Sequence, residues 1–220
     1  MALSGDEIPA TETPVAETAV TETPAFEAED ATDTGRESLT KKIWGFGVRH
    51  VVFMALGAAL YAGVSYVTNS LQLPGASNVS LRPGIVIPLF FGAVFGPWVG
   101  LFTGLVGNSI NDLLTGGIYW NWEIGIGLIG FITSLVIYFT RGRYNTAIRI
   151  LLAEAFSVLG LVVGLAFASI LDIWASQMTF KAVITTEFFP ALIPDLVLGL
   201  ILLPILLVAY EAAVARTGRS

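Results

Sequence analysis

The sequence contains no cysteine and only one histidine, His50. Without cysteine there can be no disulfide framework, no thiolate metal site and no thiol nucleophile. One histidine is too few for a multi-histidine metal site or for a helical metalloprotease motif, which needs two. The sequence therefore predicts neither a metal site nor a cofactor.

Charged residues are also scarce: they make up 13% of the chain, against 55% hydrophobic residues. This balance is typical of an integral membrane protein with several spans and not of a soluble domain. Basic residues are not clustered among aromatic ones, so the sequence does not indicate a nucleic-acid partner. We expect a multi-pass protein of the cell membrane.

The acidic residues concentrate in residues 1–40, which hold ten of them and a single arginine. This segment repeats Thr-Glu-Thr-Pro and is too poor in large apolar residues to offset the entropy of ordering, so we predict a disordered acidic tail. A docking arm is the alternative. Residues 1–40 also lack the basic and apolar regions of a signal peptide. The membrane domain is expected over 41–215, with a short cytoplasmic end at 216–220.

Apolar runs indicate where the chain crosses the membrane, since about 20 residues span a hydrocarbon core of roughly 30 Å. Clear single crossings are 51–67, 124–139, 150–171 and 188–210. The uncharged run 84–110 is long for one helix and short for two.

The basic residues decide how often the run 84–110 crosses, because Lys and Arg collect in cytoplasmic loops. They precede the first span and return at Arg141, Arg143 and Arg149, so an even number of crossings separates the two groups. The run must then turn, at Phe95-Gly96-Pro97-Trp98, where glycine suits a tight bend and proline suits a helix start. We predict an all-α fold of six transmembrane helices with both termini cytoplasmic and the second span short or bent.

This topology places the outer loops at 68–83, 111–123 and 172–187, and polar and aromatic residues gather at their membrane edges. Asn108, Asn111 and Asp112 are three or four residues apart and share one helix face. Rings beside amides and carboxylates suit a small-molecule pocket, although Trp and Tyr also gather at membrane interfaces for their amphipathic shape alone. The predicted substrate-binding residues are Arg82, Asn108, Asn111, Asp112, Tyr119, Trp120, Asn121, Trp122, Glu123 and Asp195, with Asp172 and Trp174 expected to converge from the last loop.

Asp195 is included because a carboxylate near mid-membrane costs about 2.5 to 3.5 kcal/mol on insertion scales and needs a partner, a proton or water. The alternative is a shallow, hydrated residue in a helix that starts late.

The first span carries a different pattern, a strip of small residues in which Ala55 and Ala59, and Ala58 and Ala62, are four apart. Such strips let helices approach closely in lipid, either within the protein or at a partner interface.

The run Pro88 to Leu113 reads P-x(3)-G-x(2)-FGP-x(2)-G-x(3)-G-x(2)-G-x(4)-DL. With the alanine strip, it resembles the substrate-capture (S) component of energy-coupling factor (ECF) transporters, over roughly residues 46 to 210. The resemblance implies a six-helix subunit that binds a vitamin or related micronutrient. It also implies a transmembrane coupling (T) subunit, met through Ala55, Ala58, Ala59 and Ala62, and two ATP-binding subunits. The chain has no phosphate-binding loop of its own.

The sequence does not identify the substrate. A flat, cationic heterocycle of thiamine or pyrimidine type suits the candidate residues, and riboflavin, biotin-like acids and queuosine precursors are alternatives. Other functions are a stand-alone secondary transporter, which usually shows internal repeats, and a structural membrane protein. An intramembrane serine protease needs a base near its nucleophile, but His50 is expected at the inner edge of the first span, and neither Ser109 nor Ser134 has a base nearby in the predicted topology. We expect a binding subunit and not an enzyme.

Overall fold

The computed structural model describes residues 43–69 and 81–218, and every regular element among them is helical. These residues belong to one structural unit, Thr40–Ser220. The predicted acidic tail, the basic residues Lys41 and Lys42, and most of the first expected outer loop lie outside the described residues.

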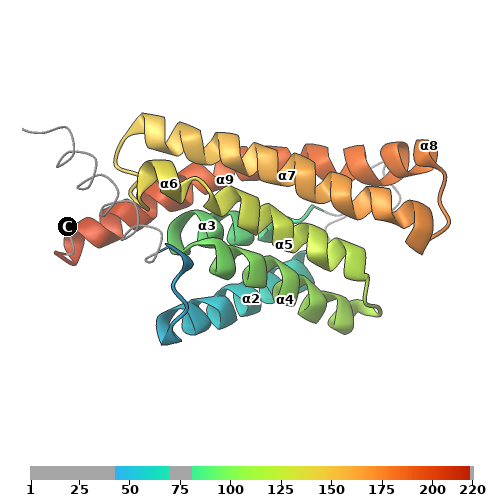
Figure 1. Ribbon diagram of the computed structural model, residues 1–220, viewed down its shortest axis with the longest axis horizontal. Coiled ribbons are helices and arrows are strands. Elements are labelled where there is room, and N and C mark those ends of the chain that lie inside the picture. Colours follow the sequence, from blue (N-terminus) through green and yellow to red (C-terminus); the bar gives the residue numbers. More distant parts are fainter. Residues whose placement is uncertain (1–42, 70–80, 219–220) are drawn as a thin grey trace, which may run out of the picture. The chain divides into compact units, whose positions relative to one another are not determined.

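Six membrane helices pack along one another in the described part of the chain (Figure 1). They are α2 (Val48–Thr68), α3 (Val86–Phe95), α4 (Pro97–Thr115), α5 (Trp120–Ser134), α7 (Ala147–Ala175) and α9 (Phe189–Arg216). Shorter elements extend three of them: η1 (Pro83–Ile85) precedes α3, α6 (Ile137–Thr140) follows α5, and α8 (Phe180–Ala182) and η2 (Val183–Phe188) lead into α9. The prediction of an all-α membrane protein with six helices is confirmed.

Four of these helical runs are long and apolar enough to cross a membrane: Val48–Thr68, Trp120–Thr140, Ala147–Ala175 and Phe180–Arg216. The run Pro83–Phe95 is apolar but shorter, which confirms the prediction of a short second span. Helix α4 has 19 residues, and Asn108, Asn111 and Asp112 make its second half more polar.

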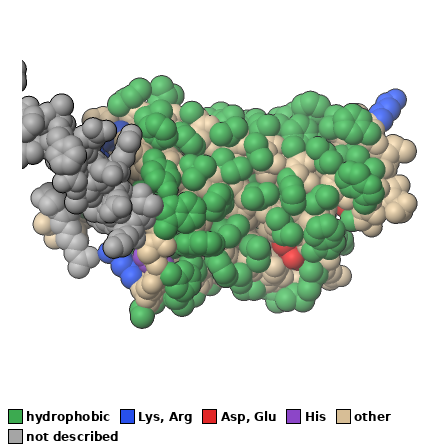
Figure 2. Space-filling model, viewed as in Figure 1, with side chains coloured by type: hydrophobic (Ala, Val, Ile, Leu, Met, Phe, Trp, Pro, Cys, Tyr) green, Lys and Arg blue, Asp and Glu red, His purple; other side chains and the backbone are tan. Residues whose placement is uncertain are grey.

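Helix α3 can be short because it lies inside the bundle. None of its residues is exposed, and Leu89 and Ala93 belong to the buried core. The same core draws Ile126 and Ile129 from α5 and Leu203 from α9. The buried helix is thus enclosed by longer neighbours, whose outer faces are hydrophobic over most of the flank seen in Figure 2.

A tight turn between α3 and α4 falls where the sequence predicts it. Gly96 has φ 107°, in the region that favours glycine, and Pro97 occupies the first turn of α4. Proline is tolerated there because the first helical N–H groups have no partner within the helix. Local chemistry was sufficient to locate this turn.

Glycines let α4, α5 and α7 meet backbone to backbone. A Cβ added to Gly130 would lie 2.3 Å from the carbonyl oxygen of Gly100, and a Cβ added to Gly164 would lie 2.5 Å from that of Gly125. A side chain at either position would have to push the helices apart. Small residues at helix crossings let membrane helices gain close van der Waals packing.

The expected boundaries of the second and third outer loops were wrong. Helix α4 continues to Thr115 and α5 begins at Trp120, so residues 116–119 replace the expected loop 111–123. Residues 176–179 likewise replace 172–187. The physical reason is that polar side chains in the last turns of α4 and α7 are buried inside the bundle, so their polarity does not end the helices.

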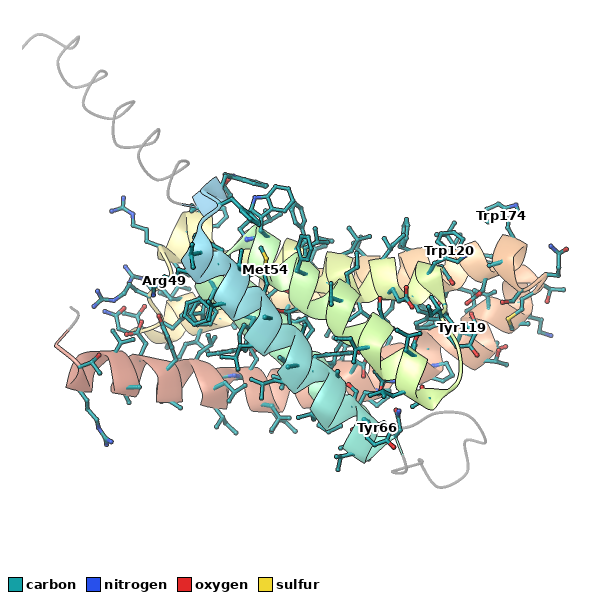
Figure 3. The ribbon with its side chains drawn as sticks, turned by 90° about the horizontal axis from the view of Figure 1, so that it is seen from below. Arg49, Met54, Tyr66, Tyr119, Trp120 and Trp174 are labelled. Carbon is teal, nitrogen blue, oxygen red and sulfur yellow. The ribbon has the colours of Figure 1, made fainter. Side chains whose placement is uncertain are left out.

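The bundle has two ends. At the arginine end, which holds residues 141–146, the Tyr144 hydroxyl donates to the carbonyl oxygen of Ala93, and Arg143 lies 3.9 Å from Glu211. Burial raises the pKa of the Tyr144 phenol. At the opposite end, called the cavity end below, residues 116–119 join α4 to α5 and residues 176–179 join α7 to α8. Tyr119, Trp120 and Trp174 lie toward this end, away from Arg49 (Figure 3).

Candidate functional site

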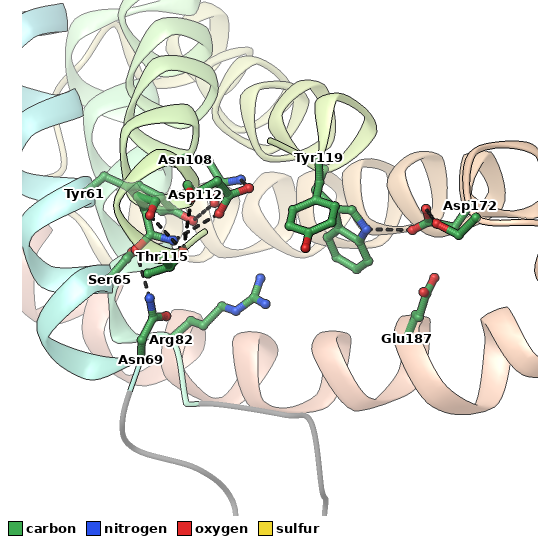
Figure 4. Close-up of a pocket in the computed structure, with 13 residues that line it drawn as sticks. Tyr61, Ser65, Asn69, Arg82, Asn108, Asp112, Thr115, Tyr119, Asp172 and Glu187 are labelled. Atoms are coloured by element: carbon green, nitrogen blue, oxygen red, sulfur yellow. Dashed lines mark hydrogen bonds between the residues drawn. The ribbon is translucent and has the colours of Figure 1, made fainter. Parts of the chain in front are cut away.

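A cavity of about 460 Å³ opens at the cavity end. This volume is in the range of small-molecule sites, roughly 300 to 1,000 Å³. Its walls come from α2, the segment before η1, α4, α5, α7 and η2 (Figure 4). The lining residues are Tyr61, Ser65, Asn69, Arg82, Asn108, Asn111, Asp112, Thr115, Tyr119, Trp122, Asp172, Ser176 and Glu187.

One wall is a chain of hydrogen bonds between α2 and α4. The Tyr61 hydroxyl donates to Asn108 Oδ1 at 3.0 Å, and Asn108 Nδ2 donates to Asp112 Oδ2 at 3.2 Å. Asn111 Nδ2 donates to the second oxygen of Asp112 at 3.2 Å, while Asn111 Oδ1 accepts from Asn69 at 3.1 Å. The three polar residues of α4 are therefore fixed by each other and by α2. Such a network holds hydrogen-bonding groups in a set position before a ligand arrives.

Arg82 extends into the cavity from the turn before η1, as Figure 4 shows. Its guanidinium carbon lies 6.0 Å from the centroid of the Trp122 ring. It interacts electrostatically with Asp112 and with Asp195, which is 2% exposed and lies behind the wall on α9. Arg82 is therefore the charged group that acts on the buried carboxyl group of Asp195.

The opposite wall is acidic. Trp122 Nε1 donates to Asp172 Oδ2 at 2.7 Å, and the Ser176 hydroxyl donates to Asp172 Oδ1 at 2.8 Å. Glu187 interacts with Asp172, and the two carboxyl groups face each other in Figure 4. Glu187 belongs to η2, whose six residues form a π-helix. π-Helical turns are rare and occur frequently at functional sites.

The structure brings six of the ten predicted substrate-binding residues to the cavity lining, and these are Arg82, Asn108, Asn111, Asp112, Tyr119 and Trp122. Four do not line it. Trp120 is 52% exposed and points outward, whereas Asn121 is buried and donates to the carbonyl oxygen of Ala168, joining α5 to α7. Glu123 and Asp195 are both buried; Glu123 interacts electrostatically with Asp112, and Asp195 with Arg82.

The last expected loop contributes one of its two candidates: Asp172 lines the cavity, while Trp174 is 66% exposed and does not. Sequence reasoning missed Tyr61, Ser65, Asn69, Thr115, Ser176 and Glu187. A signal existed for Tyr61 and Ser65, which are one turn apart on an otherwise apolar helix and therefore share a face. Glu187 carried no comparable signal, because only the π-helix fixes its direction.

The alanine strip of α2 divides between two faces. Ala58 and Ala62 are buried and lie on the side of α2 that packs against α4, whereas Ala55 and Ala59 are exposed. A Cβ added to Gly63, one turn beyond Ala59, would meet no atom within 4 Å. Within the alanine strip, Ala55 and Ala59 are therefore the residues that another subunit could contact.

Metal binding has no support within residues 43–69 and 81–218, where no group of three or more His, Cys, Asp or Glu side chains is placed to hold an ion. The cavity instead offers rings, amides, hydroxyls and carboxylates. This set can hold a small organic molecule through stacking and hydrogen bonds.

Comparison with known proteins agrees with this arrangement. A UPF0397 protein of Vibrio atlanticus (strain LGP32) is 32% identical over 124 residues, which cover 52% of this chain and 67% of the relative. The family described as "ECF-type riboflavin transporter, S component" matches residues 45–212. Members of this family are integral membrane components of transporters and not enzymes. The chain therefore belongs to the S components of the ECF-type riboflavin transporter family.

Proposed function

We propose that this protein is the substrate-binding subunit of an ATP-driven, ECF-type importer and that its cavity holds a vitamin or related micronutrient. The observation that carries the proposal is the cavity of about 460 Å³ with preset polar groups, in a chain that matches an S-component family over most of its length. A structural membrane protein would have no need for a hydrogen-bonded network facing an open cavity.

The cavity chemistry supports a planar ligand. Tyr119 and Trp122 provide aromatic faces, and the Trp122 ring is held in place by its hydrogen bond to Asp172. Amide and hydroxyl groups of Asn108, Asn111 and Thr115 surround these rings. Riboflavin, which the family description names, is a planar ring system with many hydrogen-bonding groups and is the first vitamin to test.

Transport requires partners in this proposal. A membrane-embedded coupling subunit and two ATP-binding subunits provide the energy, and the exposed face of α2 with Ala55 and Ala59 meets the coupling subunit. Small exposed side chains support this role because they allow close helix approach within lipid. Ala58 and Ala62 would act indirectly, by keeping α2 packed on α4.

Replacement of Trp122 tests the site. We expect Trp122→Ala to weaken vitamin binding by about tenfold or more, since it removes a stacking face and one donor to Asp172. Isothermal titration calorimetry on the purified protein in mild detergent, with a panel of vitamins, measures the change. Trp174→Ala is the matched control, because Trp174 is exposed outside the cavity, and it should bind like the unchanged protein.

Equal binding by Trp122→Ala and Trp174→Ala would contradict the proposed site.

Reconstitution into proteoliposomes tests the mechanism: the isolated protein should not accumulate vitamin, and uptake should require the coupling and ATP-binding subunits. Uptake by this chain alone would instead identify a secondary transporter.

A further inference from the structure

We propose that the Asp172–Glu187 wall of the cavity is a subsite for a positively charged group of the substrate. On this inference the protein prefers a flat, cationic heterocycle to a neutral one. The inference rests on the proposed function, since it takes the cavity to be the substrate site.

Charge is distributed unevenly around the cavity. The charged side chains that line it are Arg82, Asp112, Asp172 and Glu187. Arg82 acts electrostatically on Asp112 and on the buried Asp195, and its guanidinium carbon lies 6.0 Å from the centroid of the Trp122 ring. On the opposite wall, Glu187 interacts with the like-charged Asp172, and no basic side chain acts on it among the described residues.

The opposite wall has only neutral donors. Asp172 is 4% exposed, and its two oxygens accept from the Trp122 indole and the Ser176 hydroxyl. Glu187 Oε2 is buried and has no hydrogen-bond partner. Among residues 43–69 and 81–218, the salt bridge that the structure shows joins Arg143 to Glu211 at the arginine end, so neither Asp172 nor Glu187 takes part in one. Two adjoining carboxyl groups, one of them buried and the other with a buried unpaired oxygen, favour a bound cation or a proton.

Aromatic faces lie next to this acidic wall. The Trp122 indole is bonded to Asp172 itself, and the Arg82 guanidinium already lies near the Trp122 ring. The electron-rich face of a tryptophan attracts cations. On the proposal, a flat cation stacks on Trp122 and directs its positive charge toward Asp172 and Glu187.

The local backbone adds an independent reason. Glu187 reaches the cavity from a π-helical stretch, Val183–Phe188, at the start of a helix that is α-helical from Phe189 onward. Such π-helical stretches are rare and occur frequently at functional sites. Here the π-helical stretch carries a carboxylate with an unused oxygen.

Titration calorimetry with two vitamins of different charge tests the inference. Thiamine serves as the cationic probe and riboflavin as the neutral one, with the full-length protein purified in mild detergent at pH 7. We expect thiamine to bind more tightly than riboflavin. Glu187→Gln should weaken thiamine binding by about 10- to 100-fold, the usual effect of losing a hydrogen bond to a charged group, and should change riboflavin binding little.

Two further variants keep the result interpretable. Asp172→Asn keeps one acceptor oxygen for the Trp122 indole, and its NH2 group can donate to the Ser176 hydroxyl; because it removes the charge, it should also weaken thiamine binding selectively. Glu154→Gln is the control, because Glu154 is a buried carboxylate on α7 that does not line the cavity; it should leave both affinities unchanged.

Tighter binding of riboflavin, or thiamine binding that Glu187→Gln leaves unchanged, would overturn the inference while leaving vitamin binding intact. Native mass spectrometry extends the test to ligands that co-purify with the protein, and a neutral or anionic ligand there would overturn it too. If neither vitamin binds and nothing co-purifies, the proposed function itself fails along with the inference.

Discussion

At the scale of single residues, Gly130 shows how closely the helices of this bundle pack. Any side chain there would meet the backbone of Gly100. Backbone cannot rotate away as a flexible side chain can, so α4 and α5 would have to separate. We expect Gly130→Ala to destabilise the protein by about 1 to 3 kcal/mol, as overpacked cores do. Thermal unfolding in detergent, followed by intrinsic fluorescence, measures this as a lower Tm.

Gly63→Ala is the matched control for this prediction. Its added methyl group would meet nothing within 4 Å, and alanine favours a helix over glycine by roughly 1 kcal/mol. The Tm should therefore stay level or rise. A Tm that falls equally for both variants would show that the packing at Gly130 is not special.

At the scale of elements, α2 has two faces with different tasks. We expect Ala59→Leu to leave the Tm of the isolated protein nearly unchanged, because Ala59 is exposed, and to reduce co-purification with the coupling subunit. Ala58→Leu should instead lower the Tm, because Ala58 is buried and a larger side chain overpacks the core. Co-purification that survives Ala59→Leu would exclude this face as the partner surface.

The elements also show what the sequence could and could not predict. The turn at Gly96 and Pro97 was predictable because two adjacent residues with strong backbone preferences define it. The ends of α4 and α7 were not, since Asp112 and Asp172 look like loop residues until the helices around them form a polar interior. Hydropathy records polarity along the chain and not the direction in which a side chain points.

The candidate site follows the same rule. Asn108, Asn111 and Asp112 were predictable together because helical spacing places them on one face. The sequence could not predict which of Trp120, Asn121 and Trp122 would line the cavity. Adjacent residues on a helix point in different directions, and the packing of the helix decides which one faces inward. The α7 backbone holds the Asn121 amide, and Trp120 is left exposed outside the cavity.

At the scale of the whole molecule, the orientation in the membrane remains a prediction from the arginines. The chain has no cysteine, so single cysteines can be labelled without background. We expect a membrane-impermeant maleimide added to whole cells to label Ile118→Cys, at the cavity end, and not Asn145→Cys, at the arginine end. Both residues are exposed in loops.

Inside-out vesicles provide the reciprocal control, in which Asn145→Cys should react and Ile118→Cys should not. Labelling of both positions from the same side would contradict the six crossings. Labelling of Asn145→Cys alone from outside would reverse the orientation and place the cavity toward the cytoplasm.

The burial of α3 has a consequence for the lipids. Its run of helix from Pro83 to Phe95 is too short to match the membrane, but every residue of α3 is buried or half-buried, so longer helices cover most of that deficit. The helical run Phe180–Arg216, with 37 residues, is about 55 Å long at 1.5 Å per residue. The 29-residue helix α7 is also longer than a hydrocarbon core of roughly 30 Å. Hydrophobic mismatch therefore acts on these two helices as an excess of length, and we expect their tilt to absorb changes in acyl-chain length.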